Sequence, residues 1–321
     1  MGEKTETGAG ARELVERLVG GDRRALARAI SRVEADGDDV PELVRELYPH
    51  TGGAFSVGFT GPPGVGKSSV IAELIQLYRA GEMKVGVVSV DPSSPFSRGA
   101  ILGDRIRLAD HFLDSGVFIR SMGSRGHLGG LAAASRLGAL AMEAYGVDAV
   151  IYETVGVGQG EVEVASVADT VVLALQPGSG DAVQALKAGV MEVADVLCVN
   201  KADHPQARAA AREARQALEI GHELDPDTPL PEIVMTRGDS GEGVEELRDA
   251  IDTHRERLAE SGTLDERRMG SIKEFMLSWT RAKLEDRMRE RLGRQDEELV
   301  SKVYRRELDP ISAAETLYRE V

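Results

Sequence analysis

The sequence predicts an α/β fold in which a mostly parallel sheet forms a central domain, flanked by helical extensions at both ends of the chain. Across the middle of the chain, short apolar runs alternate with helix-length amphipathic stretches, which is typical of βαβ units with helices on both faces of the sheet. A glycine-rich loop follows the first of these runs. The two ends of the chain show helical apolar spacing and no strand-like run. We therefore expect three parts, residues 1–54, 55–262 and 263–321.

The amino-terminal part is expected to form two or three short helices. Apolar side chains recur three and four positions apart in Leu14–Val19 and again in Leu26–Val33, which is the period of one helix face. Gly20-Gly21 and the segment Asp36–Asp39 interrupt this pattern, and residues of these types favour turns.

The central part is expected to contain the strands and the carboxy-terminal part only helices. Strands are predicted at Phe55–Thr60, Val85–Val90, Val117–Ile119, Ala149–Tyr152, Val171–Leu175, Val196–Val199 and Ile233–Met235. Two helices are predicted after them, at about residues 266–293 and 296–318. An apolar stripe on the first of these helices consists of Ile272, Phe275, Met276 and Trp279. It would pack either on the central domain or on a second copy of the chain.

Composition argues against several classes of protein. The formal net charge of −15 argues against non-specific nucleic-acid binding. No apolar run reaches the roughly 18 to 20 residues that a membrane helix needs, and the start of the chain lacks the order of a signal peptide, so we expect a cytoplasmic protein. The single cysteine, Cys198, lies in an apolar run and is expected to be buried and unreactive. The histidines are scattered without ligand spacing.

The most specific single motif is a phosphate-binding loop. The segment Gly61-Pro62-Pro63-Gly64-Val65-Gly66-Lys67-Ser68 matches G-x-x-x-x-G-K-[ST], between a predicted strand and a helix that begins at Ser69. Backbone amides of such a loop and the amino terminus of the helix together form a nest for phosphate oxygens. We expect Lys67 to bridge the β- and γ-phosphates and the Ser68 hydroxyl to bind Mg²⁺.

A candidate base-reading loop, Asn200-Lys201-Ala202-Asp203, follows the sixth predicted strand. The Asp203 carboxylate can accept hydrogen bonds from both the ring N1–H and the exocyclic amine of guanine, a donor pair that adenine lacks. The Lys201 stem is expected to pack on the base, while Asn200 ties this loop to the phosphate loop. GTP is therefore the expected substrate and GDP the product.

Three acidic residues are candidates for holding Mg²⁺. Asp91 and Glu153 each follow a predicted strand, and Asp104 ends the segment Ile101–Asp104. Because the carboxyl ends of parallel strands share the edge that carries the phosphate loop, carboxylates there can hold Mg²⁺ directly or through water. Which of them positions the attacking water instead stays open. Alternatively, Asp91 forms a turn before Pro92 and Asp104 is solvated or caps a helix.

Glycine-rich segments are candidates for switches that respond to the γ-phosphate. Gly156 can offer its amide to that phosphate, and Gln159 is a candidate for orienting water or, alternatively, an ordinary exposed glutamine. A second such stretch leads from Gln176 to Asp181 and on to Lys187. Asp181 is either a switch residue or a helix N-cap, and Lys187 is either a switch residue or a surface lysine.

Together these motifs resemble the methylmalonyl-CoA mutase-associated GTPases, a family formerly described as lysine/arginine/ornithine transport kinases. The resemblance covers nearly the whole chain. Besides the phosphate and base-reading loops, it rests on Gly21–Ile30, Tyr48–Gly52, Asp91–Pro95, Ile101–Asp104, Gly126–Gly130 and Glu153–Gln159. Members of the family usually carry a serine with a small neighbour in the last base-contacting loop. This chain departs from that pattern with Thr236, Arg237 and Gly238, which we assign to the nucleotide site.

The resemblance implies a homodimer, which favours a dimer contact for the apolar stripe, and a further switch near Asp181 to Lys187. It implies a Mg-GTP site that uses Lys67, Ser68, Asp91, Asp104 and Glu153. The implied role is to gate delivery of adenosylcobalamin to methylmalonyl-CoA mutase, or a related cobalamin-dependent mutase, and to protect that mutase from inactivation. Two other functions stay open: a small-molecule kinase, which would need an acceptor pocket and a base, and a nickel-insertion GTPase, which would usually carry His and Cys clusters.

Overall fold

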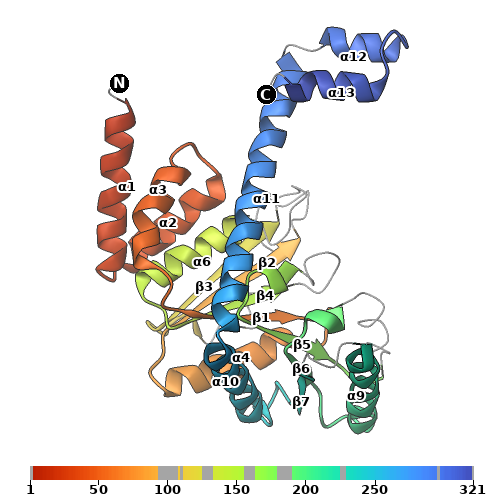
Figure 1. The fold of residues 1–321 in the computed structure, drawn as a ribbon. Coiled ribbons are helices and arrows are strands. Elements are labelled where there is room, and N and C mark those ends of the chain that lie inside the picture. Colours follow the sequence, from red (N-terminus) through yellow and green to blue (C-terminus); the bar gives the residue numbers. More distant parts are fainter. Residues whose placement is uncertain are drawn as a thin grey trace. The chain divides into compact units, whose positions relative to one another are not determined.

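The computed structural model describes residues 3–92, 108, 111–124, 133–154, 163–178, 190–224, 229–294 and 297–319. The chain divides into two compact units, Met1–Gly270 and Ser271–Val321. A seven-stranded parallel sheet lies at the centre of the first unit (Figure 1), so the α/β fold predicted from the sequence is confirmed. The strands are β1 (Phe55–Thr60), β2 (Val85–Pro92), β3 (Val117–Ser124), β4 (Ala149–Thr154), β5 (Thr170–Leu175), β6 (Val196–Val199) and β7 (Glu232–Met235).

The order of the strands across the sheet is β3-β2-β4-β1-β5-β6-β7, and every neighbouring pair is parallel. The strands agree with the predicted runs, except that β2, β3 and β4 extend further at their carboxyl ends and β5 and β7 begin one residue earlier. β2 and β3 pair residue by residue from Val85 with Val117 to Pro92 with Ser124, so backbone pairing continues where the apolar pattern has stopped. β1 lies between β4 and β5, at the point where the strand order reverses and where such sheets bind ligands.

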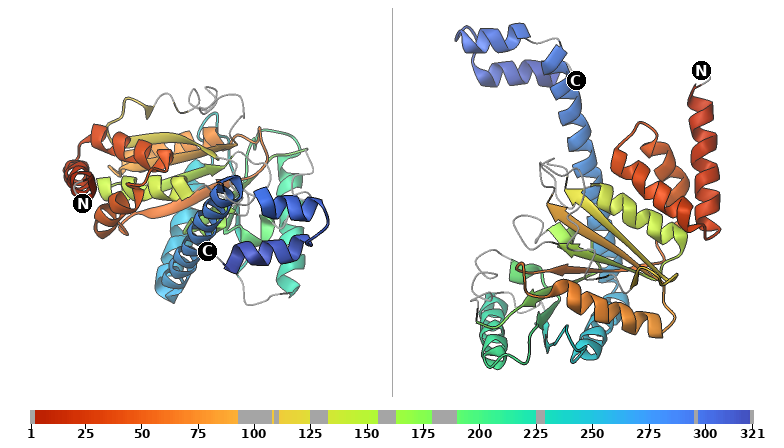
Figure 2. Two further views of the ribbon diagram at one scale, coloured as in Figure 1. Left: turned by 90° about the horizontal axis from the view of Figure 1, so that it is seen from above. Right: turned by 180° about the vertical axis from the view of Figure 1, so that it is seen from behind.

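Helices cover both faces of the sheet (Figure 2). They are α1 (Glu3–Val19), α2 (Arg23–Ala35), α3 (Val40–Leu47), α4 (Lys67–Ala80), α6 (Ala133–Tyr145), α9 (Ala207–Leu224) and α10 (Val244–Ser261). One face packs on α4 and α10, and the other packs on α6 and α9. Helices α1, α2 and α3 pack against α6 and extend the layer on that face. The sequence predicts two or three helices in this part of the chain, and the structure has three.

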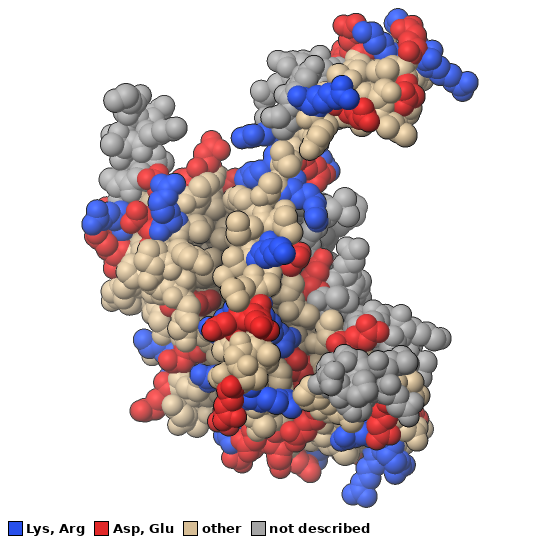
Figure 3. Space-filling model, in the orientation of Figure 1, with Lys and Arg blue, Asp and Glu red and all other residues tan. Residues whose placement is uncertain are grey.

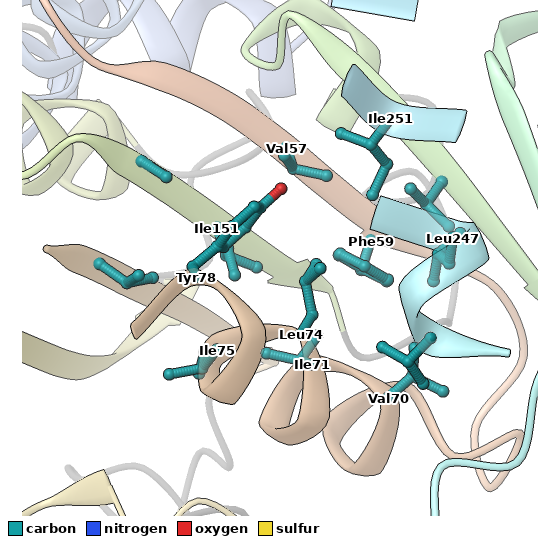
Figure 4. Packing of buried hydrophobic residues seen from close by; sticks show 14 of the residues in the cluster. Val57, Phe59, Val70, Ile71, Leu74, Ile75, Tyr78, Ile151, Leu247 and Ile251 are labelled. Carbon is teal, nitrogen blue, oxygen red and sulfur yellow. The ribbon is translucent and has the colours of Figure 1, made fainter. Parts of the chain in front are cut away.

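The core between α4, α10 and the sheet fixes the position of the phosphate loop. Figure 4 shows side chains from β1, β4, α4 and α10 pointing toward one another, among them Val57, Phe59, Ile151, Ile71, Leu74 and Leu247. Each buried side chain of this kind contributes about 1.5–3 kcal/mol. This core holds α4 along its length. Because α4 begins at Lys67, the end of the phosphate loop is held in one position as well.

An ion-pair cluster, here called the far-edge clasp, lies at the amino ends of β5 and β6. Asp169 directly precedes β5, and both of its carboxylate oxygens accept hydrogen bonds from Arg268, each at 2.9 Å. Asp195 precedes β6 and likewise accepts from Arg267, with contacts of 3.0 and 2.9 Å. Buried His254 lies 3.2 Å from Asp195. Two consecutive arginines at the start of α11 (Thr263–Arg294) are therefore bound to the edge opposite the phosphate loop.

The second unit is helical and contains the rest of α11 with α12 (Glu297–Tyr304) and α13 (Pro310–Arg319). The single helix predicted at 296–318 is wrong, because the chain turns between α12 and α13. Arg306 adopts φ of 61°, a left-handed conformation that ends a helix. Asp309 precedes Pro310, which disfavours helical backbone, and its Oδ1 accepts from the amides of Ile311 and Ser312.

On the face drawn in Figure 3, the described Lys and Arg side chains are interspersed with Asp and Glu rather than gathered in one field. None of the helices in the described ranges is long and apolar enough to cross a membrane.

Candidate nucleotide-binding site

The phosphate loop connects the end of β1 to the start of α4 (Figure 1). Two of its glycines are required by close approaches to neighbouring segments. Gly66 caps α4 with φ of 97°, and a Cβ there would lie 2.4 Å from Nδ2 of Asn200. A Cβ on Gly61 would lie 2.1 Å from the carbonyl oxygen of Ala174 in β5. The loop is therefore packed against both β5 and the base-reading loop.

Lys67 is buried within this loop, with a relative exposure of 6%. Its ammonium donates hydrogen bonds to the carbonyl oxygens of Gly61, at 2.6 Å, and Pro62, at 3.1 Å. These bonds fold the side chain back over the loop. The charge is thus held beside the backbone amides that would bind phosphate oxygens, where a low dielectric strengthens its effect on an anion.

Glu153 stands next to the phosphate loop because β4 pairs with β1. The Ser68 hydroxyl donates to Glu153 Oε1 at 2.5 Å, and Ser89 of β2 donates to Oε2 at 3.1 Å. All three residues are buried. A serine hydroxyl and a carboxylate are hard oxygen ligands of the type that Mg²⁺ prefers, so these residues fit the ion that the motif implies.

The other predicted metal and switch residues lie wholly or partly outside the described part of the chain. Asp91 is the seventh residue of β2 and pairs with Gly123 of β3, which places its backbone at the edge that carries the phosphate loop; its side chain is not described. Asp104, Gly156, Gln159, Asp181 and Lys187 lie outside the described residues.

Asn200 joins the base-reading loop to two other loops. Its Nδ2 donates to the carbonyl oxygen of Val65 at 2.8 Å. Its Oδ1 accepts from the amide of Gly238 at 3.0 Å and from the Thr236 hydroxyl at 3.2 Å. Thr236 is itself fully buried and lies 3.1 Å from Cys198 Sγ. One amide side chain therefore fixes the phosphate loop, the base-reading loop and the loop of Thr236 and Gly238 relative to one another.

Lys201 and Asp203 belong to the base-reading loop, which Asn200 holds in place. Lys201 has φ of 58°, and its ammonium donates to the carbonyl oxygen of Gly64 at 3.0 Å and to Gln176 Oε1 at 2.6 Å. The Asp203 side chain is 58% exposed and lies 3.6 Å from Nε of Arg237. The stem of Lys201 thus bridges toward the phosphate loop, while the carboxylate of Asp203 stays open to a ligand.

Sequence reasoning misses Ser89, and it places Gln176 at the start of a candidate switch stretch without giving its side chain a role. Ser89 interrupts the apolar run of β2 with a hydroxyl, which is a usable signal, because a polar group inside a buried strand needs a partner. Gln176 directly follows β5, and only its place at the site edge of the sheet points to it. Cys198 is buried as expected, and burial raises the pKa of its thiol to about 11. Among the described residues, no group of three or more His, Cys, Asp or Glu side chains is arranged to hold a metal ion.

Comparisons with known proteins agree on one family. The family model described as "Methylmalonyl Co-A mutase-associated GTPase MeaB" matches residues 26–293. A Pyrococcus abyssi protein named as a GTPase is 45% identical over 313 residues, covering 96% of each chain. GTPase ArgK of Escherichia coli is 36% identical over 275 residues, covering 84% of this chain and 83% of ArgK. The crystal structure of an LAO/AO transport system kinase superposes with a TM-score of 0.70 at 27% identity, covering 97% of each chain.

Proposed function

Because the chain belongs to the methylmalonyl-CoA mutase-associated GTPase family, we propose that its GTP hydrolysis gates the delivery of adenosylcobalamin to a cobalamin-dependent mutase and protects that mutase. GTP hydrolysis itself follows from the family and from relatives that are named as GTPases. The finer role is supported by the family's name, which associates it with methylmalonyl-CoA mutase.

The observation that carries the nucleotide assignment is the set of hydrogen bonds made by Asn200. These bonds hold the base-reading loop against both the phosphate loop and the loop of Gly238, and a site whose parts are held together in this way binds more strongly because less ordering is needed. The triphosphate would lie along the phosphate loop, and the base would lie beside Lys201 and Asp203.

We assign the chemistry to residues of the same edge. Lys67 would stabilise the charge that develops on the transferred phosphoryl group. Ser68 and Glu153, with Asp91 and Asp104, would hold Mg²⁺, which when bound neutralises charge on the phosphates. Ser89 would keep one oxygen of Glu153 fixed by donating its hydrogen bond. The attacking water is placed by one of the acidic residues.

Exchanging Asp203 for asparagine is expected to change the preferred base. The amide side chain would present a donor where guanine also presents donors, so GTP should bind more weakly and xanthosine triphosphate more tightly. Competition against a fluorescent nucleotide measures both affinities. The unaltered protein serves as the control and should prefer GTP to ATP, and equal affinity of the unaltered protein for both would contradict base reading by Asp203.

A partner mutase is expected to raise the GTPase rate, because slow hydrolysis results when the groups around the γ-phosphate are not fixed in advance. By reciprocity, GTP and GDP should then differ in their effect on mutase affinity. Turnover is measured with and without methylmalonyl-CoA mutase, and mutase binding is measured with GDP and with a non-hydrolysable GTP analogue. If neither rate nor affinity responds, the GTPase assignment stands and the mutase role fails.

We propose that residues 263–321 form a dimerisation arm, that residues 55–262 form a GTPase domain, and that residues 1–54 form an amino-terminal extension. Ile272 is 46% exposed and Met276 63% exposed on α11, although Phe275 and Trp279 lie 6.1 Å apart and partly cover each other. An exposed apolar helix face of this kind is typical of a protein interface.

The full-length variant Ile272→Glu/Met276→Glu is therefore expected to sediment as a monomer, because two carboxylates would be buried without partners in the contact. Lys273→Ala on the same helix is the matched control and should leave the sedimentation coefficient unchanged. A dimer that survives both glutamates would place the contact elsewhere.

A further inference from the structure

Arg237 differs from the other residues around the base-reading loop because its charge faces three carboxylates. Its guanidinium lies 3.6 Å from Asp203, 3.4 Å from Asp239 and 3.5 Å from Glu242. Asp239 and Glu242 belong to the same turn as Arg237 and are highly exposed, at 72% and 70%. Asp203 is the one carboxylate of the three that comes from the base-reading loop.

The backbones on either side of this contact are fixed. The amide of Ala202 donates to the carbonyl oxygen of Thr236 at 2.9 Å, so the residues just before Asp203 and Arg237 are joined directly. The amide of Arg237 donates to the carbonyl oxygen of Glu242 at 2.8 Å, and its carbonyl accepts from Gly241 at 2.9 Å. Because both main chains are held, the relation between the two side chains is set by their own torsions.

The Nε atom of Arg237 is a buried donor without a hydrogen-bond partner among the described residues. The ion-pair contact of this atom is with Asp203 Oδ1, at 3.6 Å, slightly beyond hydrogen-bond distance. The Arg237 side chain as a whole is 31% exposed, but a donor atom shielded from water is more favourable when paired, so a small movement of the carboxylate toward Nε is favoured. That movement would hold one oxygen of Asp203 and restrict its rotation about the side-chain bond.

We infer that Arg237 is a positioning residue that orients the Asp203 carboxylate and thereby sets selectivity for guanine. This inference rests on the proposed reading of guanine by Asp203. A freely rotating carboxylate meets two donors on the base edge only part of the time, whereas a carboxylate held by Arg237 is preorganised for both. Guanine, which presents two donors, gains more from this than hypoxanthine, which presents only the ring N1–H.

The test compares GDP with inosine diphosphate in full-length protein. Arg237→Ala is expected to weaken GDP about tenfold, which is about 1.4 kcal/mol, and to weaken inosine diphosphate less, so that discrimination between the two falls. The KM for GTP should rise in Arg237→Ala, because the contact acts on the base and not on the γ-phosphate. Arg237→Lys, which keeps the charge, should restore part of the discrimination.

Two controls separate positioning from a structural role of the turn. Asp239→Asn/Glu242→Gln removes the other two ion pairs and leaves Arg237 with Asp203, and it should change GDP affinity by less than about twofold. In a double-mutant cycle, Arg237→Ala should have almost no further effect on GDP in the Asp203→Asn background. Circular dichroism of each variant checks that the fold is retained.

The inference is overturned if Arg237→Ala weakens both nucleotides equally, if it leaves GDP affinity unchanged, or if its effect persists beside Asp203→Asn. A different result, in which the unaltered protein does not prefer GDP to ADP, would remove base reading by Asp203 altogether. Failure of the inference and failure of the proposed guanine site are therefore distinguishable in one set of measurements.

Discussion

Replacing Lys67 with alanine is expected to lower the rate of GTP cleavage by about two to three orders of magnitude, the range for loss of one preorganised charge-stabilising group. The ammonium of Lys67 is buried and held by the carbonyl oxygens of Gly61 and Pro62, so alanine removes a charge whose position is fixed. Single-turnover cleavage on protein saturated with GTP measures the effect, because it separates the chemical step from weakened binding.

Two further variants make this result interpretable. Lys67→Arg keeps the charge but changes the geometry of its hydrogen bonds, and it should also be impaired if the position of the charge matters. Lys84→Ala removes a lysine whose ammonium lies 6.0 Å from the ring of Tyr145, just before β2 at the opposite edge of the sheet, and cleavage should stay normal. Cleavage at the ordinary rate in Lys67→Ala would show that the loop is misassigned.

Replacing Asp169 with alanine should lower the free energy of unfolding of the first unit by about 2–3 kcal/mol. The Asp169 side chain is 6% exposed, and its partner Arg268 is 36% exposed, so the loss should be somewhat smaller than for a fully buried pair. The substitution leaves Arg268 without its bidentate partner. It also removes the acceptor of the Ser56 amide at the start of β1.

Urea denaturation followed by far-ultraviolet circular dichroism is the suitable measurement. The chain has 1 tryptophan, Trp279, which lies in the second unit, so intrinsic fluorescence would report on the wrong part. Glu298→Ala is the matched control, because it breaks a pair with Lys302 in which the carboxylate is 80% exposed, and it should leave the transition of the first unit in place. Equal transitions for the two variants would mean that the far-edge clasp adds nothing to stability.

The strands could be predicted from the sequence because a parallel sheet covered on both faces needs continuous apolar runs. The order of the strands could not be predicted, since it depends on which buried faces meet. The chain turn at Arg306 was missed because the apolar spacing continues through it, although Pro310 after Asp309 was an available signal.

The phosphate and base-reading loops could be located because their chemistry depends on residues that are close in sequence. The hydrogen bonds that hold the site together could not be predicted, since they join segments that are distant in sequence. Asn200 reaches Val65 across 135 residues, and Ser89 reaches Glu153 across 64. The contact between Arg237 and Asp203 belongs to the same class. The resemblance to the family marks the stretch around Arg237 as a departure, but only the geometry shows that its charge faces the carboxylate that is expected to read the base.

The far-edge clasp also has a consequence for the order of events during folding. Arg268 and Asp169 are separated by 99 residues, and Arg267 and Asp195 by 72. Closing such long loops costs entropy before the contact can form, and contacts of this kind tend to form after the transition state. Loss of the clasp should therefore accelerate unfolding and leave the refolding rate nearly unchanged. Arg267 and Arg268 would then form their contacts late in folding and slow the unfolding of the native fold.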